Sequence, residues 1–129
     1  MGKNAKLAAA KLALMSCEEK NVVLRAAASA LSDNADYILA ENAKDVSLAR
    51  EKGMSEALID RLSLTKQRIL DMSDGILQVS KLPDPVGEIV SENTRPNGIL
   101  IREVRVPIGV IGIIYESRPN VLLCGSCFC

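Results

Sequence analysis

The chain has 129 residues, and its 16 basic and 16 acidic side chains leave no formal net charge. This balance, with only 2% aromatic residues, excludes the basic patches and stacking platforms of nucleic-acid binding. The absence of histidine excludes a Ser-His or Cys-His couple and a His-based zinc site within the chain. With 48% hydrophobic and 25% charged residues, the composition indicates one modest globular domain.

The N-terminal residues favour helices. Residues 3–15 are rich in Ala, Leu and Lys, all strong helix formers. Leu14 to Cys17 has a faint likeness to a lipoprotein cleavage site, but Lys11 leaves too short an apolar run for a signal core. Ser16 followed by Glu19 instead predicts a capping box at the start of a second helix. No run of residues approaches transmembrane length, so we expect no membrane association.

Four further helical features follow in chain order. The second helix is predicted to bury one apolar stripe: Val22, Val23, Ala26, Ala27, Ala30 and Leu31. Asp33 or Asn34 can cap a third helix, which should stop at Gly53 in a left-handed conformation. Its predicted apolar stripe is Ile38, Leu39, Ala43, Val46 and Ala49. Ser55 can cap a short fourth helix, and residues 65–80 should form a fifth, whose apolar positions are Ile69, Met72, Ile76 and Val79.

Beyond Leu82 the pattern changes to β-structure. Pro83-Asp84-Pro85 cannot continue a helix. Residues 87–94 and 99–106 flank the turn sequence Arg95-Pro96-Asn97-Gly98, which predicts a β-hairpin. Gly109 to Tyr115 then reads as a short strand buried on both faces, as parallel strands are. Such a strand needs partners delivered by crossover connections, and none follow, so we expect an incomplete fold.

The loop after this predicted strand is the candidate site, because α/β folds bind ligands there. Within five residues, Glu116 to Asn120, it offers a carboxylate, a hydroxyl, a guanidinium and a carboxamide. The carboxamide of Asn120 can donate to a developing oxyanion, and Arg118 can pair with a phosphate. The competing interpretation is an ordinary polar surface loop.

The segment VRVPIGVIGIIYESRPNV closely resembles the corresponding stretch of the gamma-glutamyl phosphate reductase family, also called glutamate-5-semialdehyde dehydrogenases. The stretches EEKNVVLRAAASAL, ILAENAKDVSLAREKGMSEALIDRLSLT, LPDPVGEI and TRPNGILIREVRVP resemble the same family. The resemblance runs in the expected order from residue 5 to residue 121.

The resemblance implies an α/β, aldehyde-dehydrogenase-like fold that is truncated here. Residues 1–82 would be the N-terminal helical part of the cofactor domain, and residues 83–107 an oligomerisation-type β-hairpin. Residues 108–121 would be the first strand and loop of a Rossmann-like cofactor domain. The hairpin, residues 87–106, would pair its edges with another part of the enzyme or another subunit, which makes a homo-oligomer the expected assembly.

The resemblance also implies a cytoplasmic enzyme of proline biosynthesis that reduces L-glutamyl 5-phosphate to glutamate 5-semialdehyde with NADPH. A cysteine thiolate would attack the acyl phosphate, and the resulting thioester would accept hydride. By position, Asn120 matches the asparagine of the aldehyde dehydrogenase oxyanion hole. Tyr115, Glu116 and Ser117 would line the nicotinamide side of NADP, and Arg118 would serve substrate or cofactor.

The last eight residues, LLCGSCFC at 122–129, depart from the family and are predicted to be an aberrant tail of a truncated or frame-disrupted product. Three crowded cysteines without histidine do not make a zinc site, so no metal is expected. Cysteine clustered in this way indicates a reducing, cytosolic setting rather than a disulfide framework. The family's nucleophile would lie in another domain, so neither Cys17 nor these cysteines is predicted to replace it, and the chain alone should be inactive.

Two alternatives stay open beside the reductase. The chain could be a non-catalytic helical and hairpin module that associates with a full-length reductase. It could also derive from a related acyl-phosphate or aldehyde dehydrogenase, although Glu116 to Asn120 stands where general aldehyde dehydrogenases carry a Trp-Asn pair. The sequence does not separate a stand-alone reductase from half of a bifunctional enzyme.

Overall fold

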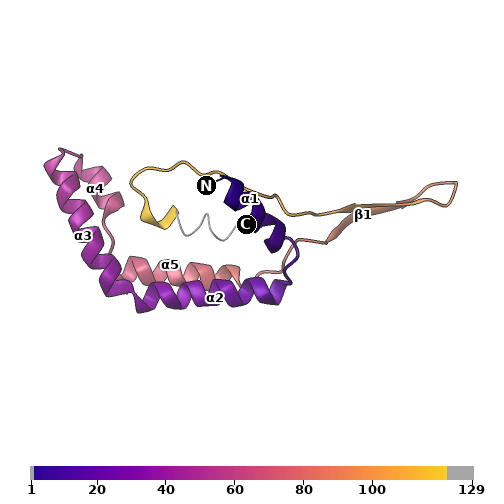
Figure 1. Ribbon diagram of the computed structural model, residues 1–129, viewed down its shortest axis with the longest axis horizontal. Helices are drawn as coiled ribbons and strands as arrows, with labels where there is room; N and C mark the ends of the chain where they lie inside the picture. The colour runs from indigo at the N-terminus through magenta and orange to yellow at the C-terminus, as the bar shows by residue number, and fades with distance from the viewer. Residues whose placement is uncertain (1, 122–129) are drawn as a thin grey trace.

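The computed structural model describes residues 2–121 as five helices followed by a β-hairpin and a returning segment (Figure 1). The helices are α1 (Gly2–Leu12), α2 (Cys17–Asp33), α3 (Ala35–Glu51), α4 (Glu56–Leu62) and α5 (Lys66–Val79). The hairpin strands are β1 (Ile89–Thr94) and β2 (Leu100–Val104). The predicted tail, residues 122–129, lies outside the described residues.

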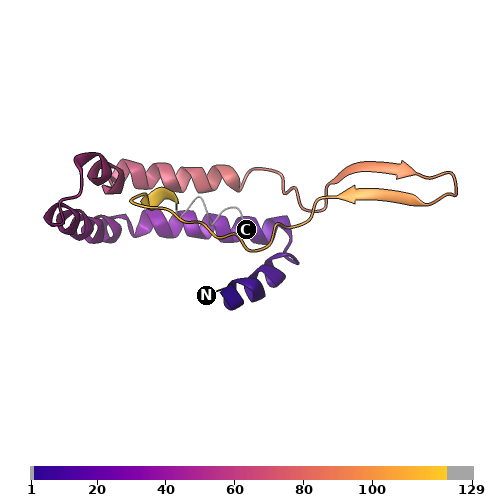
Figure 2. The same ribbon diagram turned by 90° about the horizontal axis from the view of Figure 1, so that it is seen from above.

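The molecule is elongated, with the helices at one end and the hairpin projecting from the other (Figures 1 and 2). Helices α2 and α5 lie side by side, and α3 and α4 extend from the end opposite the hairpin. The core between them is small, and Ile69 on α5 is its only large side chain that is fully buried among the described residues. The buried hydrophobic side chains are Ala28, Ala35, Ala49, Ile59, Ile69 and Ile76.

Helix boundaries follow local capping chemistry. The predicted capping box at α2 is confirmed, because the Ser16 hydroxyl accepts from Glu19 N and the Glu19 carboxylate accepts from Ser16 N at 2.8 Å. At α5 the Thr65 hydroxyl accepts from Arg68 N at 3.1 Å. Gly53 ends α3 with φ of 72°, as predicted, because a residue without Cβ adopts this conformation readily.

The apolar stripe predicted for α2 is wrong. Val22 and Val23 are more than half exposed, and the buried residue of this helix is Ala28. Helix α2 is so rich in alanine that two different faces look apolar, and periodicity cannot choose between them. The choice is made by α5, whose Ser73 hydroxyl donates to Ala28 O at 3.0 Å and brings the two helices together at a small residue. An apolar face of α2 is therefore left exposed.

The hairpin prediction is confirmed, with strands shorter than expected. β1 and β2 pair antiparallel, with Glu92 opposite Arg102 and a bulge between Ile89 and Ser91. Gly98 has φ of 84° in the connecting turn. Every residue of both strands is exposed, so cross-strand contacts such as Arg102 to Glu92, at 2.6 Å, hold the hairpin together.

The buried strand predicted for Gly109 to Tyr115 is not formed. These residues carry no strand hydrogen bonding, and Ile114 is fully exposed. The segment runs back along the helical part of the molecule (Figure 1). A parallel strand depends on neighbouring strands for its hydrogen bonds, and the described residues contain only the two hairpin strands, which pair with each other. The apolar run that contains Val110, Ile111, Ile113 and Ile114 thus remains exposed.

Candidate functional site

The predicted site loop turns sharply at the end of the returning segment. Ser117 has φ of 49°, the only positive φ among the described non-glycine residues. This left-handed conformation costs free energy for a residue with Cβ, and such residues gather at functional loops. The chain then becomes helical at residues 119–121, where Val121 N donates to Arg118 O at 3.1 Å. The loop therefore consists of a strained turn at Ser117 followed directly by a short helical segment at residues 119–121.

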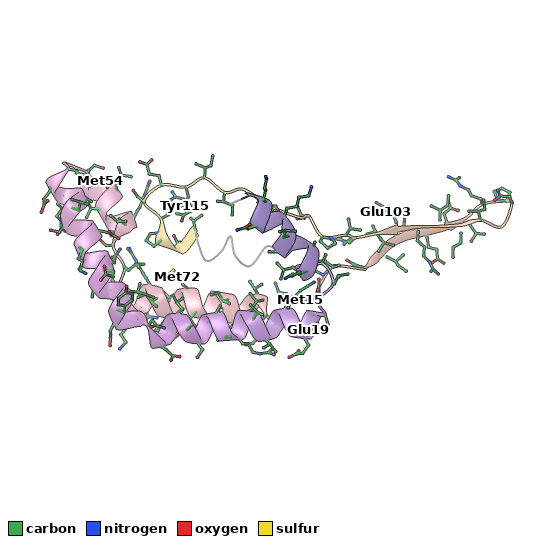
Figure 3. All side chains as sticks on the ribbon, viewed as in Figure 1. Met15, Glu19, Met54, Met72, Glu103 and Tyr115 are labelled. Atoms are coloured by element: carbon green, nitrogen blue, oxygen red, sulfur yellow. The ribbon has the colours of Figure 1, made fainter. Side chains whose placement is uncertain are left out.

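This turn closes one side of a cavity of about 660 Å³. The opposite side is formed by α4, α5 and the segment between them. Met72, labelled in Figure 3, lies on the part of α5 that faces the turn. The volume falls in the range of small-molecule sites. The lining residues are Asp60, Arg61, Ser63, Leu64, Arg68, Asp71, Met72, Gly75, Ile76, Val79, Arg118, Pro119, Asn120 and Val121.

The Arg68 guanidinium binds other residues of the cavity lining at the end of α4. Its Nη1 donates to Asp60 O and to Ser63 O, each at 2.7 Å, and so satisfies carbonyls at the end of α4. Its Nη2 lies 3.4 Å from the Asp60 carboxylate. Neither Arg61 nor Arg118 forms an ion pair with a carboxylate within residues 2–121. Two guanidinium groups at the cavity are thus available to an anionic ligand.

The structure brings together only part of the predicted site. Arg118 and Asn120 line the cavity, whereas Tyr115, Glu116 and Ser117 do not. Tyr115 is 44% exposed on the returning segment (Figure 3) and Glu116 is exposed beside it. Of the five predicted residues, three therefore lie outside the cavity, and the other two, Arg118 and Asn120, lie across it from α4 and α5.

The residues that α4 and α5 contribute were missed in the sequence. Arg68, Asp71, Met72, Ile76 and Val79 follow the spacing of one helix face. Sequence periodicity predicts the apolar members of this face as core, and it assigns no role to the charged residues at its start. The sequence signal that could have indicated this cavity wall is the change from charged to apolar residues along one face of α5. A cavity with this lining can hold an anion at Arg61 and Arg118 and an apolar group against α5, with Asn120 as an amide donor.

No established family profile matches this chain. It is 56% identical to a gamma-glutamyl phosphate reductase of Geobacillus over 95% of its length, and 52% identical to that of Carboxydothermus hydrogenoformans over all 129 residues. Over its own length the chain is thus similar to the N-terminal part of gamma-glutamyl phosphate reductases. It spans 30% and 31% of the lengths of these two reductases.

Crystal structures of two gamma-glutamyl phosphate reductases have the same arrangement. The Thermotoga maritima reductase superposes with a TM-score of 0.92 over 97% of this chain at 42% identity. The Saccharomyces cerevisiae reductase gives a TM-score of 0.90 over 97% of the chain at 34% identity. The chain covers 30% and 32% of those two chains. Among residues 2–121, no helix is long and apolar enough to cross a membrane.

Proposed function

We propose that this chain supplies the N-terminal part of a gamma-glutamyl phosphate reductase, which reduces L-glutamyl 5-phosphate to glutamate 5-semialdehyde in proline biosynthesis. The observation that carries the proposal is identity of 56% and 52% to two named reductases over nearly the whole chain. The cavity beside Arg118 and Asn120 is consistent with a site for a small anionic substrate.

Within this proposal Asn120 acts on the developing oxyanion. When a thiolate attacks the acyl phosphate, negative charge moves onto the carbonyl oxygen, and the Asn120 amide donates a hydrogen bond to it. Arg118 pairs with an anionic group of substrate or cofactor, because a guanidinium offers paired donors to phosphate or carboxylate oxygens. The nucleophilic cysteine is proposed to lie in the part of the reductases that this chain does not cover.

NADPH is the proposed hydride donor, on the resemblance of the chain to the family. Residues 2–121 do not by themselves fit a dinucleotide, because Tyr115, Glu116 and Ser117 do not line the cavity beside Arg118 and Tyr115 is 44% exposed. Tyr115, Glu116 and Ser117 can therefore contact the cofactor from one side only, and no step of hydride transfer is assigned to them.

The exposed apolar surfaces support a proposed assembly with the rest of the enzyme. The chain exposes 9654 Å², against about 6,700 Å² for a compact monomer of its mass. The returning segment contributes large apolar side chains to this surface, since Val106, Ile108 and Ile114 are 75%, 83% and 103% exposed. We propose that this segment becomes a sheet strand in the complete reductase and that the hairpin contacts another subunit.

A chimeric enzyme tests this proposal. Residues 1–121 would be joined to the remaining part of the Carboxydothermus reductase and assayed for NADP-dependent, phosphate-dependent oxidation of glutamate semialdehyde. The chimera should be active, and Asn120→Ala should lower kcat by about 10²- to 10³-fold, the usual effect of losing one oxyanion donor. Asn4→Ala, at an exposed position on α1, should leave kcat unchanged. A folded but inactive chimera would contradict the proposal.

A non-catalytic role as a docking module is the second candidate, favoured by a hairpin in which every strand residue is exposed. Tagged chain would be mixed with an intact relative and analysed by size-exclusion chromatography. Co-elution that is lost on deleting residues 95–98 would favour this role. A chain that elutes alone at every concentration would count against it.

A further inference from the structure

The hairpin joins the helical body through a short connection, residues 80–88. Pro83 and Pro85 restrict φ on either side of Asp84, and Gly87 follows with φ of 88°. No strand residue of the hairpin is buried, so packing does not set the direction in which it projects. That direction must be determined at its base, which lies next to the start of α2 near the labelled Glu19 (Figure 3).

One ion pair crosses this junction. The Lys20 ammonium, on the first turns of α2, lies 2.6 Å from Asp84 Oδ2. The other carboxylate oxygen, Oδ1, accepts from Val86 N at 3.0 Å. A single carboxylate therefore holds both α2 and the turn that leads into the hairpin.

The Lys20–Asp84 pair differs from the other ion pairs of the described residues. Its side chains are 22% and 19% exposed, whereas every partner in the other five pairs is at least 46% exposed. Exposed pairs contribute little because water and salt screen them, and partial burial strengthens this one. Ordering the pair also costs less conformational entropy than it would in a flexible loop, since the flanking prolines leave the connection few alternative conformations.

We propose that Lys20 and Asp84 form a clamp that sets the direction of the hairpin relative to the helices. With the clamp closed, the hairpin projects in one orientation. It can then contact another subunit without a change in the conformation of the connection at its base. With the clamp broken, the connection at residues 80–88 rotates and the hairpin samples several directions. This inference is independent of the proposed reductase activity, because it concerns the shape of the chain itself.

Distance measurements by electron paramagnetic resonance test the clamp. All four cysteines would be replaced by serine, and spin labels placed at Ala26→Cys on α2 and Arg95→Cys in the hairpin turn. The unmodified clamp should give one narrow distance distribution. Lys20→Met and Asp84→Asn should each raise the population of other distances about fivefold, the size expected for one partly buried pair. Lys20→Arg keeps the charge and should keep the narrow peak.

Two comparisons separate the clamp from general damage. Lys66→Met removes an exposed lysine at the start of α5, and its distribution should match that of the unmodified chain. Asp84→Asn retains an oxygen that can accept from Val86 N, so it isolates the ion pair from the turn. Circular dichroism would confirm that each variant keeps its helices. If folded Lys20→Met and Asp84→Asn give the same narrow peak as the unmodified chain, the clamp does not set the hairpin direction.

Discussion

Asn42 shows how one polar side chain joins segments that are distant in the chain. Its Nδ2 donates to Leu62 O at 3.0 Å and its Oδ1 accepts from Leu64 N at 2.7 Å, and the residue is 8% exposed. The side chain thus satisfies both backbone groups where the chain leaves α4. The sequence places Asn42 on a helix but does not reveal these partners, since they lie about twenty residues away.

We expect Asn42→Ala to lower the free energy of unfolding by about 1–3 kcal/mol, because it leaves a partly buried carbonyl and amide without partners. Asn42→Asp keeps the acceptor for Leu64 N but loses the donor to Leu62 O, so it should also destabilise the chain. Asn4→Ala at an exposed position should change stability by less than about 0.5 kcal/mol. Chemical denaturation would measure all three, and equal effects for Asn42→Ala and Asn4→Ala would contradict the assignment.

At the scale of single elements, helix starts and the hairpin were predictable because their signals are local. The capping box needs only Ser16 and Glu19, and the hairpin turn needs only residues 95–98. The face of α2 was not predictable, since its burial depends on where α5 lies. Asn34 shows a similar limit, because its side chain donates to Ala30 O of the preceding helix and does not cap α3.

The two N-cap serines give a matched test of capping. Ser16→Ala should cost about 1 kcal/mol of stability, because it leaves the first turn of α2 with an unsatisfied amide. Ser55→Ala should cost less, since Ser55 makes no side-chain hydrogen bond to α4. Thermal unfolding followed by circular dichroism would rank the two variants, and a loss for Ser55→Ala equal to or larger than that for Ser16→Ala would contradict the predicted ranking.

The capping box also predicts a pH dependence. Hydrogen bonds from the Ser16 backbone and then its hydroxyl lower the pKa of Glu19. A carboxyl whose pKa is lowered in the folded state stabilises that state above its unfolded pKa, about 4.3 for glutamate, and the stabilisation is lost as the pH falls through the folded value. Nuclear magnetic resonance of the Glu19 carboxyl should show this lowered pKa, and Ser16→Ala should raise the pKa only part of the way, because the backbone N–H of residue 16 still donates to the carboxylate.

At the scale of the whole molecule, the buried core is small compared with the apolar surface that remains exposed to solvent. Among residues 2–121, the buried hydrophobic side chains are three alanines and three isoleucines. The returning segment leaves large apolar side chains exposed, and the TM-score of 0.92 with the Thermotoga maritima reductase shows the same arrangement within a longer chain. We therefore expect marginal stability and self-association at high concentration.

Two isoleucines distinguish the existing core from the proposed interface. Ile69→Ala should cost about 2–5 kcal/mol, because Ile69 is 0% exposed and the substitution leaves a cavity. Ile114→Ala should change the stability of this chain little, because Ile114 is fully exposed. In the chimera with the remaining part of a reductase, Ile114→Ala should become destabilising. If it remains neutral there, the returning segment does not enter a sheet.

The sequence by itself determined the helix starts, the hairpin turn and the left-handed stop at Gly53, because each depends on residues close together in the chain. It also determined the family resemblance, which depends on the order of residues and not on their packing. Tertiary structure alone decided which face of α2 is buried, that Gly109 to Tyr115 does not form a strand, and that Arg118 and Asn120 share a cavity with α4 and α5. These features depend on partners that are far away in sequence. An apolar pattern predicts that a surface should be covered, but the position of the neighbouring elements decides whether it is.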